Sequence, residues 1–377
     1  VVLLDRARFP RDKSCGDGLT TSALRRYEAF GLRPEAIPSW QVVGDVWLSG
    51  PTGRRVQLPL PPGPGIYAAV ARRVELDAAF LDVARRAGVR VYDGTNVADA
   101  RCVERHGLIE LDAGALEPVV ARYAIGADGM WSRLRKVLSP SPDDGGYLGD
   151  WHAFRQYFHH VGPAAATSLW VWFEPDLLPG YVWSFPLPGG RANVGFGIVR
   201  RPDQPTSLMK QQWADLVARP RIREILGPDA EPEAPHRAWP IPTRFSLDRL
   251  AGAGGRALFV GDAARVVDPM TGEGIGQALE TGKAAAAAII AAGPNHPLVA
   301  GARYRRTVER GMAVDHRLAA KLGQALAHRK GVRISMGVIG VSGWSRRNFG
   351  RWLFESSPRA VLATPHRWHR GMFSGPG

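Results

Sequence analysis

A glycine-rich segment over residues 261–282, GDAARVVDPMTGEGIGQALETG, carries the residue types best suited to hold a ligand. A short apolar run ends at Asp262, and Gly272, Gly274 and Gly276 then precede a helical pattern. Such an arrangement brings backbone N–H groups and the positive end of a helix to an anionic or electron-rich ligand. The Asp262 carboxylate would accept hydrogen bonds from sugar-like hydroxyls. A turn that merely joins a strand to a packed helix explains the same spacing.

A second carboxylate follows an apolar run at the start of the sequence. Val1 to Leu4 has the composition of a buried parallel strand, and Asp5 comes directly after it. In dinucleotide-binding folds the second strand ends in an acidic residue that binds ribose hydroxyls, about 20 residues beyond a G-x-G-x-x-G loop. We therefore expect the first strand and the phosphate-binding loop to lie upstream of Val1.

One of the two cysteines, Cys15, lies in the loop FPRDKSCGDGLT, where the neighbouring glycines allow the backbone to approach a ligand closely. The alternative is a small buried hydrophobic side chain, which is the interpretation of Cys102. Two cysteines far apart predict neither a disulfide framework nor a metal cluster. The histidines, His159 and His160 included, show no metal-ligand spacing, so no metal site is predicted.

Aromatic residues alternate in the segment PGYVWSFPLP. Tyr181, Trp183 and Phe185 are two residues apart, so in a strand all three share one face of a sheet. Packing in a core and lining a ligand pocket both explain this stripe.

The elements around these residues alternate between two architectures. Helices are expected over residues 20–30 and 73–87, antiparallel strands over 42–70 and 150–200, further strands over 89–92, 107–112, 119–125 and 256–260, and helices again from 304. This alternation implies two domains woven from successive stretches of chain. The predicted class is α/β, with a Rossmann-like domain interleaved with an antiparallel β-sheet domain and followed by a C-terminal helical segment.

Composition narrows the class of partner. The chain has 377 residues, 45% of them apolar, and a formal charge of +14. Its basic residues follow none of the spacings that specify nucleic acid, so no nucleic-acid partner is expected. The apolar run Ala284 to Ala292 is shorter than the roughly 20 residues that span a bilayer. No signal sequence opens the chain, and we expect a cytoplasmic location.

The segment GDAARVVDPMTGEGI is similar to the G-D motif of the group A flavoproteins, which have the p-hydroxybenzoate-hydroxylase-like fold, and resembles most closely the geranylgeranyl-reductase branch. The resemblance implies FAD as the cofactor. It also implies that Asp262 holds the ribityl chain, and that Pro269, Gly272, Gly274 and Ile275 line the isoalloxazine ring.

Two further segments resemble cofactor-binding motifs of the same family. GADG matches the D-G motif, which implies that Asp128 and Gly129 support the loop near the pyrophosphate and flavin. RRVELD resembles the R-x-x-L-D motif, which implies that Arg73 lies at the cofactor. Asp5 is also predicted to bind the cofactor, because it is the acidic residue at the end of the expected second strand.

Two more resemblances concern the reacting end of the site. FPRDKSCGDGL resembles the family's loop close to the flavin, which carries Cys15. PGYVWSFPLP matches the Y-x-W-x-F-P pattern of reductases that act on isoprenoid chains, which implies that Tyr181, Trp183 and Phe185 form the wall of the substrate pocket.

The resemblance and the element pattern together predict the domain boundaries. The FAD-binding domain takes residues 1–41, 71–140 and 246–310, the substrate domain takes strands over 42–70 and a β-sheet over 141–245, and a helical region takes 311–377.

The resemblance implies an enzyme that reduces carbon–carbon double bonds in the polyprenyl chains of lipids or quinones, with NAD(P)H or ferredoxin as the electron donor. An isolated alkene is not polarised by a carbonyl, so hydride transfer to one carbon requires a proton at the other. Cys15 and Tyr181 are the candidate proton donors.

Two alternatives remain at this stage. One is an FAD-dependent monooxygenase or halogenase on the same scaffold, and the other is a non-catalytic lipid-binding remnant, because the phosphate loop is outside the sequence. The basic, tryptophan-bearing stretch from RRNFGRWLF to HRWHRGMF is expected to rest on a membrane surface, with a solvated helical face as the alternative.

Overall fold

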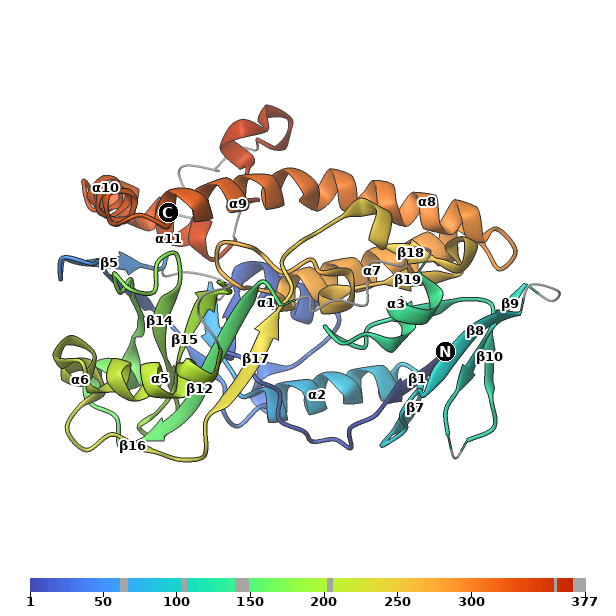
Figure 1. The fold of residues 1–377 in the computed structure, drawn as a ribbon, viewed down its shortest axis with the longest axis horizontal. Helices are drawn as coiled ribbons and strands as arrows, with labels where there is room; N and C mark the ends of the chain where they lie inside the picture. The colour runs from blue at the N-terminus through green and yellow to red at the C-terminus, as the bar shows by residue number, and fades with distance from the viewer. Residues whose placement is uncertain are drawn as a thin grey trace. The chain divides into compact units, whose positions relative to one another are not determined.

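The computed structural model describes residues 1–61, 67–103, 107–114, 116–139, 149–201, 206–355 and 358–368 (Figure 1). The chain forms two compact units, each built from three separate stretches. Unit 1 comprises Val1–Arg11, Phe80–Asp150 and Ile241–Arg317, and unit 2 comprises Asp12–Ala79, Trp151–Pro240 and Leu318–Gly377. The predicted interleaving of an α/β part with an antiparallel part is confirmed.

The described strands of unit 1 form three small sheets. In the first, β1 (Val2–Asp5) pairs in parallel with β7 (Arg90–Asp93). In the second, β11 (Ala124–Gly126) pairs in parallel with β19 (Ala257–Phe259), and β18 (Ala251–Gly252) pairs antiparallel with β19. The third is an antiparallel sheet of β8 (Asp99–Val103), β9 (Leu108–Asp112) and β10 (Val119–Ala121). The parallel pairs are the elements that a Rossmann-like fold requires.

The helices of unit 1 pack on the β11–β19 sheet. They are α3 (Arg133–Leu138), α7 (Ile275–Ala292) and α8 (Pro297–Val308), and a π-helical turn at Glu309–Ala313 leads into α9 (Val314–Leu326), which continues into unit 2. Leu258, Phe259 and Tyr304 are fully buried in their core cluster. The Tyr304 hydroxyl also donates a hydrogen bond to the Phe259 carbonyl at 2.6 Å, which ties α8 to the end of β19.

Unit 2 is organised around an eight-stranded sheet. Seven strands follow the order β16 (Glu231–Pro232), β12 (Trp151–His159), β15 (Arg191–Val199), β14 (Tyr181–Leu187), β13 (Leu169–Trp172), β4 (Asp45–Ser49) and β5 (Arg55–Pro59), and β17 (Arg237–Ile241) also pairs with β12. A three-stranded sheet of β2 (Gly18–Thr20), β6 (Ala68–Val70) and β3 (Gln41–Val42) completes the unit.

The two faces of the large sheet carry different cores, because successive side chains of a strand point to opposite faces. Trp170 and Trp172 of β13 join the cluster on one face with α4 (Pro163–Thr167), α5 (Met209–Ala218) and α6 (Pro220–Leu226). Leu169 and Val171 join the cluster on the other face, with α10 (Arg329–Ile339) and α11 (Gly343–Leu353). Figure 1 shows α5 and α6 beside β12, β14 and β15.

The remaining helical elements are α1 (Thr21–Ala29), α2 (Arg73–Arg86) and several 3₁₀ turns. Thr20 caps α1 by accepting a hydrogen bond from the Ala23 N–H. In α2, Arg73 and Asp77 form a two-point ion pair at 2.7 and 2.8 Å. Within the described residues the 3₁₀ turns are η1 (Pro34–Ala36), η3 (Thr206–Leu208), η4 (Leu247–Arg249), η5 (Ala253–Gly255), η6 (Gly261–Ala264), η8 (Val361–Ala363) and η9 (Pro365–Arg367).

Candidate active site

In unit 1, the turn after β19 brings Asp262 to the start of α7. Gly261 has a φ of 56°, a conformation that favours glycine, and its N–H donates to the Thr281 hydroxyl at 3.0 Å. Asp262 is the next residue, in η6 (Gly261–Ala264). A Cβ placed on Gly274 would lie 3.6 Å from the Oδ1 atom of Asp262. The two ends of the predicted ligand-binding segment therefore meet, as the strand–loop–helix pattern requires.

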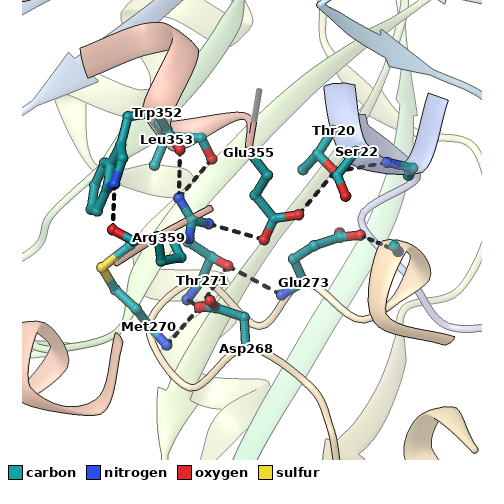
Figure 2. Close-up of polar contacts among 12 residues, drawn as sticks. Thr20, Ser22, Asp268, Met270, Thr271, Glu273, Trp352, Leu353, Glu355 and Arg359 are labelled. Atoms are coloured by element: carbon teal, nitrogen blue, oxygen red, sulfur yellow. Dashed lines mark hydrogen bonds and ion pairs between the residues drawn. The ribbon is translucent and has the colours of Figure 1, made fainter. Parts of the chain in front are cut away.

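The loop between them is closed by the buried carboxylate of Asp268, shown in Figure 2. Its Oδ1 atom accepts hydrogen bonds from the N–H groups of Met270 and Thr271 at 2.9 and 2.8 Å and from the Thr271 hydroxyl at 3.0 Å. The Asp268 backbone is joined to Glu273 at 2.8 Å and to Gly272 at 2.9 Å. These bonds hold the loop, Pro269 included, in one conformation.

The N-cap residue of α7 has no side chain with which to cap the helix. Gly274 is its N-cap residue, and no acidic side chain lies in the first turn. The Glu273 carboxylate, which precedes the helix, accepts from the Gly276 N–H at 2.9 Å. A Cβ on Gly274 would come within 3.1 Å of Val267, so only glycine fits without movement. Backbone donors at Ile275, the positive helix end and a strand-end carboxylate fit the electron-rich ring and the hydroxyl-bearing chain of FAD.

The second predicted turn of unit 1 uses its carboxylate internally. Asp128 accepts hydrogen bonds from the Ser132 hydroxyl at 2.6 Å and from the Leu134 N–H at 3.1 Å, so it holds the start of α3. Gly129 has a φ of 78°. The geometry agrees with a carboxylate that supports the loop, and its role toward FAD stays a prediction.

The last two predicted cofactor residues lie in different units. In unit 1, Asp5 ends β1 and its Oδ1 atom accepts from the Ala7 N–H at 2.8 Å. In unit 2, the Arg73 guanidinium is paired with Asp77 and nearly buried. The charge of Arg73 also acts on Cys15, which places the two side chains in one neighbourhood.

Unit 2 brings the aromatic stripe and the cysteine loop together. The rings of Tyr181, Trp183 and Phe185 follow one another along β14 with centroid separations of 6.1 Å. A Cβ on Gly16 would lie 3.1 Å from the Phe185 ring, and one on Gly18 would lie 2.8 Å from it. The glycines after Cys15 therefore allow this loop to lie directly against the stripe.

Asp17, between those two glycines, is the functional candidate that sequence reasoning missed. It is fully buried and has a φ of 67°. Its Oδ2 atom accepts hydrogen bonds from the Tyr157 hydroxyl at 2.7 Å and from Asn193 Nδ2 at 2.8 Å. Asn193 also accepts from Trp183 Nε1 at 3.1 Å. The signal that could have identified Asp17 is its type, because a carboxylate between two glycines in a ligand-adjacent loop is rarely placed there for packing.

Burial raises the pKa of Asp17 to about 6, although hydrogen bonds from Tyr157 and Asn193 and the charges of Arg155 and Arg73 act against that shift. Burial also raises the pKa of the Tyr157 hydroxyl, and the neighbouring Asp17 charge adds to the rise. The cluster thus holds a carboxylate that titrates near neutral pH beside a phenol that stays protonated.

A cavity of about 250 Å³ in unit 2 opens beside the same tyrosine. Its wall includes Asp12, Arg155, Arg72 and His236. Two guanidinium groups lie over the Tyr157 ring, that of Arg72 at 4.3 Å and that of Arg155 at 4.2 Å from its centroid. Cation–π attraction to both groups helps to hold the ring in place.

The sequence predicts no metal site. Pairing of β12 with β16 sets Glu231 opposite His159, and the ligand atoms of His159, His160 and Glu231 lie within 4.8 Å of one another. His160 and Glu231 are exposed, so this cluster lacks the closed setting of a structural metal site.

Comparison with known proteins bears on the cofactor and the chemistry. A family model described as an FAD binding domain matches residues 1–292. A menaquinone reductase of Mycolicibacterium smegmatis is 32% identical over 349 residues, covering 85% of this chain and 78% of that protein. Digeranylgeranylglycerophospholipid reductase 1 of Methanopyrus kandleri is 29% identical over 308 residues, covering 76% of this chain and 72% of that protein.

The fold is shared with a solved structure as well. A geranylgeranyl bacteriochlorophyll reductase-like protein from Thermoplasma acidophilum matches with a TM-score of 0.77 at 17% identity, covering 97% of this chain and 92% of its own. At that identity the likeness concerns the fold alone.

Proposed function

The chain belongs to the FAD binding domain family, and from this premise we propose that it is an FAD-dependent reductase of carbon–carbon double bonds in polyprenyl chains. The observation that carries the proposal is its 32% identity to a menaquinone reductase over 85% of the chain. The two proteins named as reductases of a quinone and of a geranylgeranyl lipid support a reductase over a monooxygenase or halogenase.

Different residues of the chain would bind the cofactor, bind the substrate and donate the proton in such a reaction. In unit 1, Asp262 and the backbone donors at the start of α7 would hold FAD, which supplies hydride when reduced. In unit 2, the stripe of Tyr181, Trp183 and Phe185 would form an apolar wall for the polyprenyl chain and exclude water from it. Cys15 is the proposed proton donor, and Tyr181 is the second candidate.

The substrate class follows from the same comparison. We propose a polyprenyl quinone or a polyprenyl lipid, with NAD(P)H or ferredoxin as the source of electrons. Incubation with menaquinone and chemically reduced FAD, followed by reoxidation of any quinol in air, should give a quinone that is heavier by two hydrogens for each saturated double bond of its side chain, as measured by mass spectrometry. A product that has gained oxygen would instead indicate a monooxygenase.

Asp262→Ala is expected to weaken FAD binding by roughly tenfold to a hundredfold, because the carboxylate's charge-assisted hydrogen bonds to the ribityl hydroxyls would be lost. Titration of the protein with FAD, followed by flavin fluorescence, measures the change. Asp99→Ala serves as the control, since that carboxylate is 61% exposed in the same unit and contacts only Arg133 among the ion pairs described. Equal affinities for the two variants would refute the assignment of Asp262.

Contact with a membrane surface is the remaining part of the proposal. None of the helices in the described residues is long and apolar enough to cross a bilayer. Exposed apolar side chains gather instead on α10 and the start of α11: Ile334, Val338, Val341 and Trp344 are 54 to 79% exposed. Basic residues, among them Arg333 and Arg346, accompany them. An apolar face with a basic border fits the interface of an anionic bilayer.

Trp344→Glu combined with Val341→Glu should reduce co-sedimentation with vesicles that contain anionic phospholipid by at least about fivefold, because both apolar anchors are replaced by charges that the lipid repels. The paired control Leu298→Glu with Ile290→Glu changes exposed apolar side chains of unit 1 and should leave sedimentation unchanged. The same loss in both double variants would exclude a membrane contact specific to α10 and α11.

A further inference from the structure

Asp17 is a buried carboxylate to which the proposed reaction assigns no task. Its Oδ2 atom accepts two hydrogen bonds, from Tyr157 and Asn193. Its Oδ1 atom is buried as well and has no hydrogen-bond partner among the described residues. An ionised carboxylate with one unsatisfied oxygen is costly inside a protein. A group kept at such a cost calls for an explanation in terms of its neighbours.

One of these neighbours is Cys15, two residues earlier in the same loop. The Asp17 backbone N–H acts on the Cys15 thiol and lowers its pKa. The Asn193 side chain links the two residues, because its Nδ2 atom donates hydrogen bonds to the Cys15 carbonyl at 2.9 Å and to Asp17 Oδ2 at 2.8 Å. Because the side chain and the backbone are both tied, the carboxylate stays beside the thiol.

The charges around the thiol oppose one another. Burial raises the pKa of Cys15 most; the positive charges of Arg73 and Lys13 act to lower it, and the Asp17 carboxylate acts to raise it. Asp17 is itself faced by Cys15 in its own loop, Arg73 of α2, Arg155 and Tyr157 of β12, and Asn193 of β15. Burial alone favours the protonated thiol, and the Asp17 carboxylate adds to that effect. Without the Asp17 charge, burial would be opposed by two cations and a backbone donor, so the pKa of Cys15 would fall.

We propose that Asp17 is a positioning residue that keeps Cys15 protonated and therefore able to donate its proton. The inference rests on the proposed function in that this proton is the one delivered to the double bond. As the S–H bond breaks and the new C–H bond forms, the thiolate that remains is stabilised by Arg73 and by the Asp17 N–H, and it regains a proton from water.

The test uses the alkylation of Cys15 by iodoacetamide between pH 6 and pH 10, followed by peptide mass spectrometry, because only the thiolate reacts. In Asp17→Asn the pH midpoint of alkylation should fall, and the rate at pH 8 should rise about fivefold. Asparagine tolerates the positive φ at this position. Asp17→Gly, which is also compatible with it, is the second uncharged variant if the first does not fold.

Two controls separate charge from disruption. Asp12→Asn removes a carboxylate that pairs with Arg155 and Arg237 rather than with the thiol, and its Cys15 profile should match the parent. Cys102 in β8 of unit 1 provides an internal reference in every digest. A Cys15 midpoint that is unchanged in a folded Asp17→Asn or Asp17→Gly protein, or that moves equally in Asp12→Asn, would overturn the inference.

Neither flavin nor substrate enters this alkylation, so its result is independent of the proposed reaction. The pH profile of kcat/KM then tests the link between them. If the apparent pKa of the alkaline limb falls in Asp17→Asn by the same amount as the alkylation midpoint, the result supports Cys15 as the proton donor. If the alkylation midpoint falls while the kcat/KM profile stays in place, control of Cys15 by Asp17 stands and the proton donor of the proposed function is wrong.

Discussion

Arg135→Ala is expected to lower the free energy of unfolding by about 3 to 4 kcal/mol and to weaken FAD binding as well. The Arg135 side chain is fully buried in α3. Its Nη1 atom donates to the Ala263 carbonyl at 2.8 Å and its Nη2 atom to the Met130 carbonyl at 3.2 Å. Ala263 follows Asp262, and Met130 follows Gly129, so one guanidinium joins the two turns that are predicted to hold the cofactor. Its loss leaves two buried carbonyls without this donor and opens a cavity.

Three variants distinguish these effects in denaturant unfolding and FAD titration. Arg135→Met fills most of the volume but donates no hydrogen bond. Its free energy of unfolding should therefore lie between that of the parent and that of Arg135→Ala. Arg133→Ala removes an arginine of the same helix that is 54% exposed and should change stability by less than about 0.5 kcal/mol. If Arg135→Ala resembled Arg133→Ala in stability and in FAD affinity, Arg135 would not be the link between the two turns.

Arg135 also illustrates what a sequence leaves open. Helix α3 forms from the basic stretch Arg133–Leu138. Neither the pattern nor the composition distinguishes Arg133, which is exposed, from Arg135, which is fully buried. Burial of an arginine depends on which carbonyls a distant turn places opposite it, and that is a property of tertiary packing.

The ligand-binding segment of unit 1 was predictable because its signal is local. The apolar run, the Gly-Asp pair, the spaced glycines and the alanine-rich helix all lie within residues 256–292. In the structure they become β19, η6 and α7 in that order. The expected strand over 119–125 shows the limit of this reasoning, because it divides into β10, which pairs with β9, and β11, which pairs with β19 in another sheet.

The Asp17 cluster was not predictable in the same way, because strand register assembles it. Tyr157 lies opposite Asn193 in the β12–β15 pair, and Asn193 lies opposite Phe185 in the β15–β14 pair. A slip of one residue would turn Asn193 to the other face of the sheet. The sequence contains each residue but not the pairing that unites them with Asp17. The roles predicted for the individual cofactor and pocket residues stay predictions.

Gly195→Ala tests that register where it bears on the site. Gly195 lies in β15 opposite Trp183 of β14, and a Cβ there would come within 2.4 Å of both the Phe154 carbonyl oxygen and the Trp183 ring. The carbonyl belongs to the backbone of the neighbouring strand β12, so the added methyl group must displace that strand as well as the Trp183 ring. We expect a loss of about 3 kcal/mol or more in the free energy of unfolding.

The local consequence is sharper than the loss of stability. A displaced Trp183 gives up its hydrogen bond to Asn193, and Asn193 is the residue that ties Cys15 to Asp17. Alkylation of Cys15 should therefore accelerate at a denaturant concentration where the variant is still folded. Gly197→Ala is the matched control two residues along the same strand, because its Cβ would meet the Trp151 ring at 3.6 Å and the His152 carbonyl oxygen at 3.9 Å, both ordinary contacts. Equal stability and equal Cys15 reactivity in the two variants would contradict the packing of Trp183 over Gly195. A large effect confined to Gly195→Ala would instead mean that the glycine is needed because the aromatic stripe, the amide of Asn193 and the cysteine loop share one tightly packed face of the sheet.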